Sequence, residues 1–334
     1  MRRPFALLAG ILLVGAFALP ASVASAADDD GKGDQGFTIK DPRITESSGL
    51  TASHLHPGIY WTHNDQDTGK GVHLYAVDSG TGKTVATITL TGVGTQRDVE
   101  AVAMGPGNQI YVGDIGDNDG VTWPYVWIYK FPEPKVLKDQ SIRATQYVVK
   151  YTDGSRDAES LLVHPKTGRV YIIDKHEDGG HLYEGPATLS STGTNVFKPV
   201  KPVDLWATDA AFSPNGERVV VRGYLGGIWY DWNGGDLKRG GRFDVPLGQG
   251  ESVSYSADGT KILLGMEGAN SEVQAQDAPG GAAGTGSDSP SSSGSSGASG
   301  DSGDNAGGKL KVGALAVAVV AAVLFGFRRL TRRN

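Results

Sequence analysis

Residues 99–114 have the sequence Val-Glu-Ala-Val-Ala-Met-Gly-Pro-Gly-Asn-Gln-Ile-Tyr-Val-Gly-Asp. An acidic residue opens a short apolar strand, a Gly/Pro/Asn turn follows, and a second strand ends in polar residues. This pattern predicts two antiparallel β-strands. The 3.6-residue period that a helical solenoid would need is missing.

Four other segments have the same pattern, so the chain contains five copies of one repeat. Their starting acids are 54, 59, 50 and 42 residues apart. A period of roughly 40 to 60 residues with strand-type alternation predicts the four-stranded blades of a β-propeller with WD40-like repeats. The copies begin at Glu46, Glu100, Glu159, Asp209 and Glu251.

The predicted fold class is all-β, with five four-stranded blades. In the fourth repeat we expect the outer strand at 242–247. The fifth repeat has strands at 252–256 and 261–265 and a short third one at 272–274, but no fourth. A segment before the first repeat, 37–40, would supply it and close the ring by joining the two ends. A six-bladed ring with one diverged unit is the alternative.

The first 26 residues have the features of a signal peptide. Arg2 and Arg3 precede an apolar run that ends before Pro20, and Ala24-Ser25-Ala26 is a cleavage-type site. A retained N-terminal membrane helix is the alternative. We expect residues 1–26 to be removed and residues 27–35 to be disordered.

The C-terminal end predicts a membrane anchor. The propeller is expected to span 36–270, followed by a Gly/Ser/Asp-rich flexible stalk at 271–308. An apolar stretch then predicts a single transmembrane helix at 309–328, and residues 329–334 form a basic cytoplasmic tail. These segments predict an exported, single-pass type I plasma-membrane protein with an extracellular domain at the cell surface.

Charge and cysteine content limit the classes of partner and the sources of stability that the chain can have. Outside the two basic ends the chain has 23 basic and 37 acidic residues, which argues against nucleic acid as a partner. The chain has no cysteine, so its stability must come from a core and sheet closure. We expect one domain and a monomer that binds an extracellular ligand or an envelope protein.

The predicted architecture brings polar residues to one face. The innermost strands begin there, and the second strands, being antiparallel, return to it. We expect a ligand-binding face there, because binding residues concentrate on loops that a rigid scaffold positions. Its predicted residues are Glu46, His63, Asp65, Glu100, Asp114, Glu159, Asp174, His176, Arg222 and Glu251.

The five opening acids also have a structural interpretation. A buried carboxylate can accept backbone N–H groups from the next blade and fix the blade spacing. A ring of like charges is costly without a counter-charge, which Arg97, Arg156 or Arg222 would supply. Both interpretations stay open from the sequence.

Two loops rich in carboxylate and amide oxygens suggest a calcium site. Such oxygens suit hard cations, although the spacing is not that of an EF-hand and the residues are also ordinary turn formers. The histidine spacings match no strong zinc pattern. The sequence contains neither a Gly-x-Ser-x-Gly elbow nor a cysteine, so it offers no recognisable nucleophile for covalent catalysis. The candidate calcium ligands are Asp65, Asp67, Asp114, Asp117 and Asp119.

Several of these segments carry a resemblance to known proteins. They are Ser48-Gly49-Leu50, Trp61-Thr62-His63-Asn64-Asp65, Asp98-Val99-Glu100-Ala101-Val102-Ala103 and Gly113-Asp114-Ile115-Gly116-Asp117-Asn118. Over residues 44–131 the chain resembles bacterial exported propellers of actinobacterial type, mostly uncharacterised and loosely related to phytase-like and esterase-like propellers. The resemblance implies a propeller fold and, from propeller phytases, six blades and calcium. This chain departs in having five repeats and in lacking the dense set of lysines and arginines expected around a polyphosphate.

The expected function is therefore binding of a ligand or partner protein across an acidic face, with calcium as the candidate cofactor. The alternative is a metal-dependent extracellular hydrolase of phosphate or carboxylic esters, in which the cation polarises the ester oxygen. Scaffolding within an envelope complex is a third possibility.

Overall fold

The computed structural model describes residues 35–65, 71–118 and 120–281, and all their regular elements are β-strands. Within these ranges there is no helix long and apolar enough to cross a membrane. The predicted signal peptide, transmembrane helix and tail, and most of the predicted stalk and N-terminal segment, lie outside the described residues. The strands are β1 Phe37–Thr38, β2 Ser47–Ala52, β3 Ile59–Asn64, β4 His73–Asp78, β5 Lys83–Thr91, β6 Val99–Gly105, β7 Gln109–Asp114, β8 Val126–Pro132, β9 Gln140–Arg143, β10 Thr145–Tyr151, β11 Ala158–Val163, β12 Val170–Asp174, β13 Gly180–Glu184, β14 Thr194–Val203, β15 Ala207–Phe212, β16 Arg218–Gly223, β17 Gly226–Asn233, β18 Asp236–Phe243, β19 Gly250–Tyr255, β20 Lys261–Met266 and β21 Glu272–Asp277.

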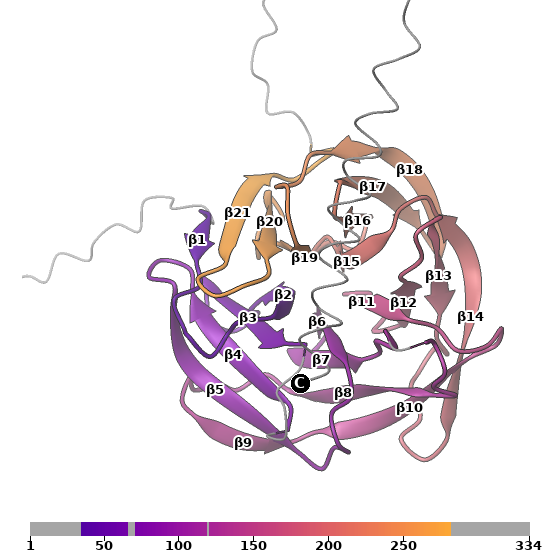
Figure 1. Cartoon of the computed structure of the whole chain (residues 1–334), viewed down its shortest axis with the longest axis horizontal. Coiled ribbons are helices and arrows are strands. Elements are labelled where there is room, and N and C mark those ends of the chain that lie inside the picture. The colour runs from indigo at the N-terminus through magenta and orange to yellow at the C-terminus, as the bar shows by residue number, and fades with distance from the viewer. Residues whose placement is uncertain (1–34, 66–70, 119, 282–334) are drawn as a thin grey trace, which may run out of the picture. The chain divides into compact units, whose positions relative to one another are not determined.

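The strands form a propeller of five blades around one axis (Figure 1). Blade 1 consists of β2–β5, blade 2 of β6, β7, β8 and β10, blade 3 of β11–β14, blade 4 of β15–β18, and blade 5 of β19–β21 with β1. The innermost strands β2, β6, β11, β15 and β19 each contact the innermost strands of both neighbours. The described residues therefore form a closed ring, and the predicted all-β propeller is confirmed.

The two ends of the propeller meet in blade 5. The short strand β1 pairs antiparallel with β21, Phe37 opposite Val273 and Thr38 opposite Glu272, and the Ile39 N–H donates to the Ser271 carbonyl (2.9 Å). This is the closure that the sequence predicted. Strand β21 continues to Asp277, so the fold extends past the expected boundary at residue 270.

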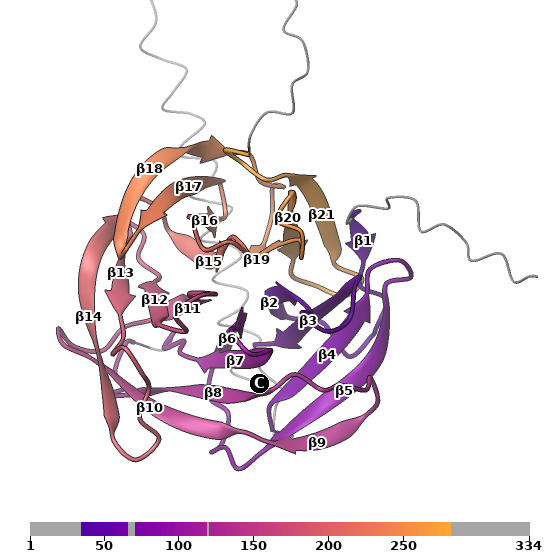
Figure 2. The ribbon, with the colours of Figure 1, turned by 180° about the vertical axis from the view of Figure 1, so that it is seen from behind.

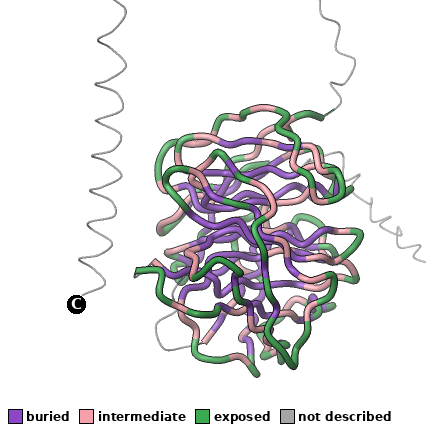
Figure 3. The backbone as a smooth tube through the Cα atoms, turned by 90° about the vertical axis from the view of Figure 1, so that its right-hand side faces the viewer, coloured by how far each residue is buried: buried purple, intermediate pink, exposed green. Residues whose placement is uncertain are grey.

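Apolar side chains fill the space between every two neighbouring blades. Strand β4 shows how alternation achieves this: Leu74 and Ala76 pack toward blade 2, whereas Tyr75 and Val77 pack toward blade 5. Five clusters of buried residues result, one for each interface between blades. The buried backbone accordingly lies inside the body and the exposed backbone in its peripheral loops (Figure 3).

Blade 2 is tied to both of its neighbours by outer strands. After β8 the chain crosses to blade 1, where β9 pairs parallel with β5, and β10 then pairs parallel with β14 of blade 3 over 148–151 and 194–197 (Figure 2). Neither parallel pairing was predicted, because nothing local in the sequence specifies a partner in another repeat. Pro199 and Pro202 follow the part of β14 that β10 covers, as expected of an edge.

The outer strand of blade 4 is β18, not the predicted 242–247. The glycines at 240 and 241, a residue type more typical of turns, lie within the strand. The Trp229 indole of β17 packs directly on Gly240, where a Cβ atom would collide with the ring. Glycine is there to admit the indole, and the turn lies earlier, at Gly234 and Gly235, both with positive φ.

Glu133 joins blade 2 to blade 1. Its buried carboxylate accepts hydrogen bonds from the Trp61 indole Nε1 (2.8 Å) and the Ser53 hydroxyl (2.5 Å). It also accepts the backbone N–H groups of His54 (3.2 Å) and Leu55 (3.1 Å). One side chain thus fixes the β2–β3 turn against the segment that leads to β9.

We predict that Glu133→Ala destabilises the protein by about 3 kcal/mol, because four donors lose their acceptor and some stay buried. Urea unfolding at pH 7.5 measures this. The control is Glu177→Ala at an exposed loop position, expected to change the free energy of unfolding by less than about 0.5 kcal/mol. Equal effects of the two changes would contradict the role assigned to Glu133.

Candidate functional site

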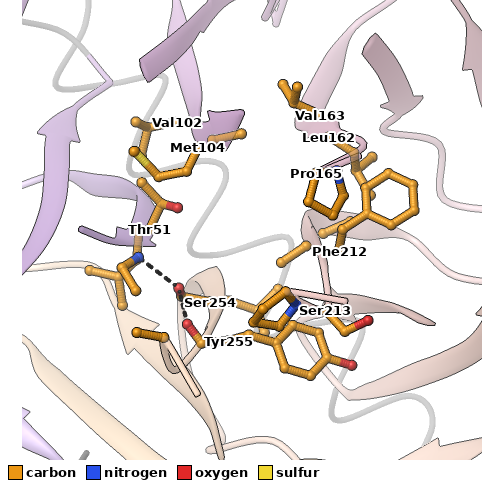
Figure 4. Close-up of a pocket in the computed structure, with 18 of the residues that line it drawn as sticks. Thr51, Val102, Met104, Leu162, Val163, Pro165, Phe212, Ser213, Ser254 and Tyr255 are labelled. Atoms are coloured by element: carbon orange, nitrogen blue, oxygen red, sulfur yellow. Dashed lines mark hydrogen bonds between the residues drawn. The ribbon is translucent and has the colours of Figure 1, made fainter. Parts of the chain in front are cut away.

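The central channel has two chemically different ends. The ends of the inner strands line a cavity of about 80 Å³ that mixes apolar side chains with serine and threonine (Figure 4). Met104, Phe212 and Tyr255 contribute to it, and no Asp, Glu, Lys or Arg side chain lines it. Charged groups gather instead at the end where the inner strands begin, which we call the mouth. The mouth is the candidate functional site.

A β-bulge interrupts every inner strand at its start. The pairing of each inner strand with the second strand shifts by one residue at this place in all five blades. A bulge places an extra residue outside the ladder and redirects its side chain. The extra residues are Ser48, Glu100, Glu159, Thr208 and Glu251, and all are buried.

The position of the bulge shows which of the five opening acids occupy equivalent places in the structure. Glu100, Glu159 and Glu251 occupy it, as the aligned repeats implied. Glu46, however, precedes β2 and is half-exposed, and Ser48 holds the equivalent place. Asp209 follows the bulge, and its carboxylate accepts the N–H groups of Ala210 (2.8 Å) and of Val253 in blade 5 (2.8 Å). Asp209 therefore has the structural role that the sequence left open.

Three carboxylates converge between blades 1 and 2. Asp65 at the end of β3 and Asp98 just before β6 join Glu100, each offering one oxygen within 4.8 Å of the others. All three are 3 % exposed or less. The Asp98 Oδ1 atom is buried and accepts no hydrogen bond from the described residues. This carboxylate trio has the oxygen donors of a hard-cation site.

The charges around the trio make Glu100 an unusual acid. Burial raises its pKa well above the ordinary value, and the neighbouring carboxylates of Asp98, Glu159 and Asp65 raise it further. Lys175 acts in the opposite direction but less strongly. A cation in the trio would offset this repulsion and favour the charged form of Glu100.

The loop after β7 covers the trio. Asn118 donates from Nδ2 to Asp98 Oδ2 (3.0 Å) and to Glu100 Oε1 (3.3 Å), and the Gly116 N–H donates to the Asp98 carbonyl (3.2 Å). A Cβ atom at Gly116 would lie 2.5 Å from Asp98 Oδ2. Glycine is thus required for the close approach of this loop to the carboxylates.

A buried lysine crosses the mouth opposite the trio. The Lys175 ammonium donates to Glu159 and to the Tyr224 hydroxyl (3.0 Å), and that hydroxyl donates to Glu251 (3.3 Å). The Lys175 side chain is 2 % exposed. Burial lowers the pKa of Lys175, but the carboxylates of Glu159, Glu251 and Glu100 together raise it well above its ordinary value. Lys175 therefore stays charged and neutralises part of the ring.

Other predicted face residues hold the scaffold. Asp114 accepts the N–H of Asp98 (2.9 Å) and the hydroxyl of Tyr129 (2.7 Å), and Asp174 accepts the N–H of His181 (2.5 Å). These carboxylates fix the ends of β7 and β12. Both carboxylates are therefore occupied by hydrogen-bond donors of the protein itself.

Arg222 lies inside the wall of the channel. It is fully buried and donates to the carbonyls of Ser252 (2.7 Å) and Gly265 (2.6 Å) in blade 5. Burial lowers its pKa to about 10, against the raising effect of Glu251. Of the two predicted histidines, His63 is buried in β3, with Nδ1 3.1 Å from the Asn64 carbonyl oxygen, and His176 is exposed.

The candidate calcium ligands are only partly brought together. Asp65 belongs to the trio, whereas Asp114 is engaged as described above, and Asp67 and Asp119 lie outside the described residues. Asp117 is buried: its Oδ2 accepts the Trp123 N–H (2.7 Å) and its own N–H donates to the next blade.

Sequence reasoning left out Asp98, Asn118, Lys175 and Tyr224. A signal for Asp98 was present, because Arg97-Asp98-Val99-Glu100 in blade 2 recurs as Arg156-Asp157-Ala158-Glu159 in blade 3. Lys175 had no such signal, since its partner Tyr224 comes from the next blade and only the packing of the two blades brings them together.

Comparisons with known proteins give low similarity. No family model matches the chain, and no curated protein matches it by sequence. Two solved structures with a provisional assignment as 6-phosphogluconolactonase are similar at 14 % identity. The one from Bacteroides uniformis has a TM-score of 0.39 and covers 70 % of this chain and 68 % of its own; the one from Bacteroides fragilis has a TM-score of 0.40 and covers 72 % and 69 %. A chain of a mitotic checkpoint complex matches at 11 % identity and a TM-score of 0.37, over 69 % of this chain and 63 % of its own.

We predict that Lys175→Met destabilises the protein by about 3 kcal/mol at pH 7.5, because Glu159 keeps a buried charge without its partner. The double variant Lys175→Met/Glu159→Gln should recover most of this loss. Lys166→Met, which removes an exposed pair with Glu217 (3.8 Å), serves as control and should cost less than about 1 kcal/mol. Urea unfolding measures all three, and an additive double variant would contradict the pairing.

Proposed function

We propose that the mouth binds a divalent cation, calcium in the first place, and that the propeller uses this centre to hold a ligand or partner protein on its acidic face. The observation that carries the proposal is the convergence of Asp65, Asp98 and Glu100 from two blades into one buried cluster. Carboxylates held this close together repel one another, and a bound cation would offset that repulsion.

The donor set fits calcium in kind and leaves part of its coordination sphere open. Calcium takes six to eight oxygen ligands, and carboxylates are its preferred donors. The trio supplies three side chains, and Asp98 Oδ1 accepts no hydrogen bond from the part of the chain that the structure describes. Because the trio provides fewer oxygens than calcium coordinates, positions remain for oxygens of the bound partner molecule. When bound, the cation would supply positive charge at an otherwise acidic face.

The cellular setting that we propose follows from the chain ends. A signal peptide, a flexible stalk and one membrane helix would make this an exported type I membrane protein with its propeller at the cell surface. The acidic composition favours basic or cation-bridged partners over nucleic acid. We propose that the protein acts as a monomer.

Titration of calcium into the chelator-stripped full-length chain in a mild detergent tests the cation site. We expect heat of binding, a rise in Tm with calcium concentration, and affinity at least about tenfold weaker in Asp98→Asn. Asp178→Asn, at an exposed loop position, is the matched control and should bind as the wild type does. Absence of both heat and a Tm shift in the wild type would overturn the proposal.

A metal-dependent ester hydrolase is the second candidate. The observation that favours it is a pair of donors in the same mouth, the Lys175 ammonium and the Tyr224 hydroxyl, which are held by Glu159 and Glu251. When bound, the cation would polarise a phosphoryl or carboxylic ester oxygen. Tyr224, whose pKa burial raises, would keep its proton and could donate it to a leaving group.

Hydrolysis of p-nitrophenyl phosphate and p-nitrophenyl acetate separates the two candidates. The hydrolase requires turnover that stops on chelation and falls at least about tenfold in Tyr224→Phe. Calcium binding without turnover of either ester would leave the binding function and remove the hydrolase.

A further inference from the structure

We propose that Arg97 is an anion-recognition residue of the mouth, which binds a carboxylate or phosphate group of the ligand beside the cation. This inference rests on the proposed cation site and adds the chemical class of the ligand. It is carried by the geometry of Arg97 and by its difference from the equivalent arginine of blade 3.

The Arg97 guanidinium lies between two indole rings. Its central carbon is 4.1 Å from the ring centroid of Trp123 and 3.7 Å from that of Trp127. The Nη2 atom donates to the Tyr125 carbonyl (3.0 Å), and this is the one hydrogen bond of the guanidinium to the described residues. The Nε atom is buried without a hydrogen-bond partner among them. Stacking on the two indoles therefore fixes the plane of the Arg97 guanidinium, and some of its N–H groups make no hydrogen bond to the described residues.

Arg156 is the counterpart of Arg97 in the next repeat and is fully engaged. Its Nη2 atom is 2.7 Å from the Asp153 carboxylate, and its Nε atom donates to the Tyr183 hydroxyl (2.6 Å). Arg97 has no carboxylate within ion-pair distance among the described residues, although it lies at an acidic end of the propeller. The same Arg-Asp-x-Glu segment thus yields a paired arginine in blade 3 and an unpaired one in blade 2.

The position of Arg97 links it to the trio. It directly precedes Asp98, and the loop that supplies Trp123 also supplies Asn118, which donates to Asp98 and Glu100. In addition, the Trp123 N–H donates to Asp117, so this loop is anchored at the mouth. An oxyanion on Arg97 would therefore lie on the same face as the cation centre, with this loop in contact with both.

The chemistry of the guanidinium selects the ligand class. Its planar donors match the two oxygens of a carboxylate or phosphate, and stacking on aromatic rings leaves those in-plane donors available. The surrounding carboxylates would repel an anion from an empty mouth. Binding of the anion is therefore expected to require calcium.

Phenyl phosphate and benzoate, with benzyl alcohol as the uncharged probe, test this inference through tryptophan fluorescence, since Trp123 and Trp127 flank Arg97. With calcium present, we expect at least one anion to bind, benzyl alcohol not to bind, and Arg97→Gln to weaken the anion at least about tenfold. Arg242→Gln, at an exposed position of β18, is the control of equal charge and should leave binding unchanged. The two anions separate phosphate from carboxylate recognition.

Calcium titration of each variant keeps the two proposals apart. Arg97→Gln should retain calcium binding and the cooperative unfolding of the wild type. If the wild type binds calcium but neither anion, or binds an anion equally well after Arg97→Gln, the role of Arg97 is refuted and the cation site stands. If the wild type binds no calcium, the cation site fails, and the calcium-dependent anion site fails with it.

Discussion

Closure of the ring by β1 is the constraint on which the rest of the structure depends. Without that strand, β21 would present an open edge and the two ends of the propeller would not be joined within one blade. With it, five inner strands must begin at one end of a common axis. The bulge at the start of each strand then directs its extra residue into the same small space, so a repeated local feature becomes a concentrated site.

That concentration of acids destabilises the folded state through repulsion, and different contacts offset the repulsion in different blades. Blade 4 has Thr208 at the bulge, and its hydroxyl donates to the Gly250 carbonyl (2.7 Å). In blades 3 and 5, Glu159 and Glu251 are bridged by Lys175 and Tyr224. Between blades 1 and 2 the carboxylates of the trio lie close together, and the proposed cation would offset their mutual repulsion.

Much of the fold was predictable because it is local. Strand positions follow from alternation, and the missing fourth strand of the last repeat pointed to closure by residues near Phe37. The parallel pairings of β9 and β10 were not predictable, since they join different repeats. The β18 strand was misplaced because a glycine that admits an indole looks like a turn residue in sequence.

The sequence by itself determined the repeat, the strand pattern, the absence of disulfides and the gathering of acids at one end, because each depends on residue type and spacing along the chain. Only the tertiary structure decided what each acid does. A one-residue bulge separates Asp209, which bonds to backbone, from Glu251, which faces the mouth. Likewise, Lys175 and Arg97 acquire their different surroundings from other strands and loops, because pairing and burial of a charge depend on contacts that exist only in the folded chain.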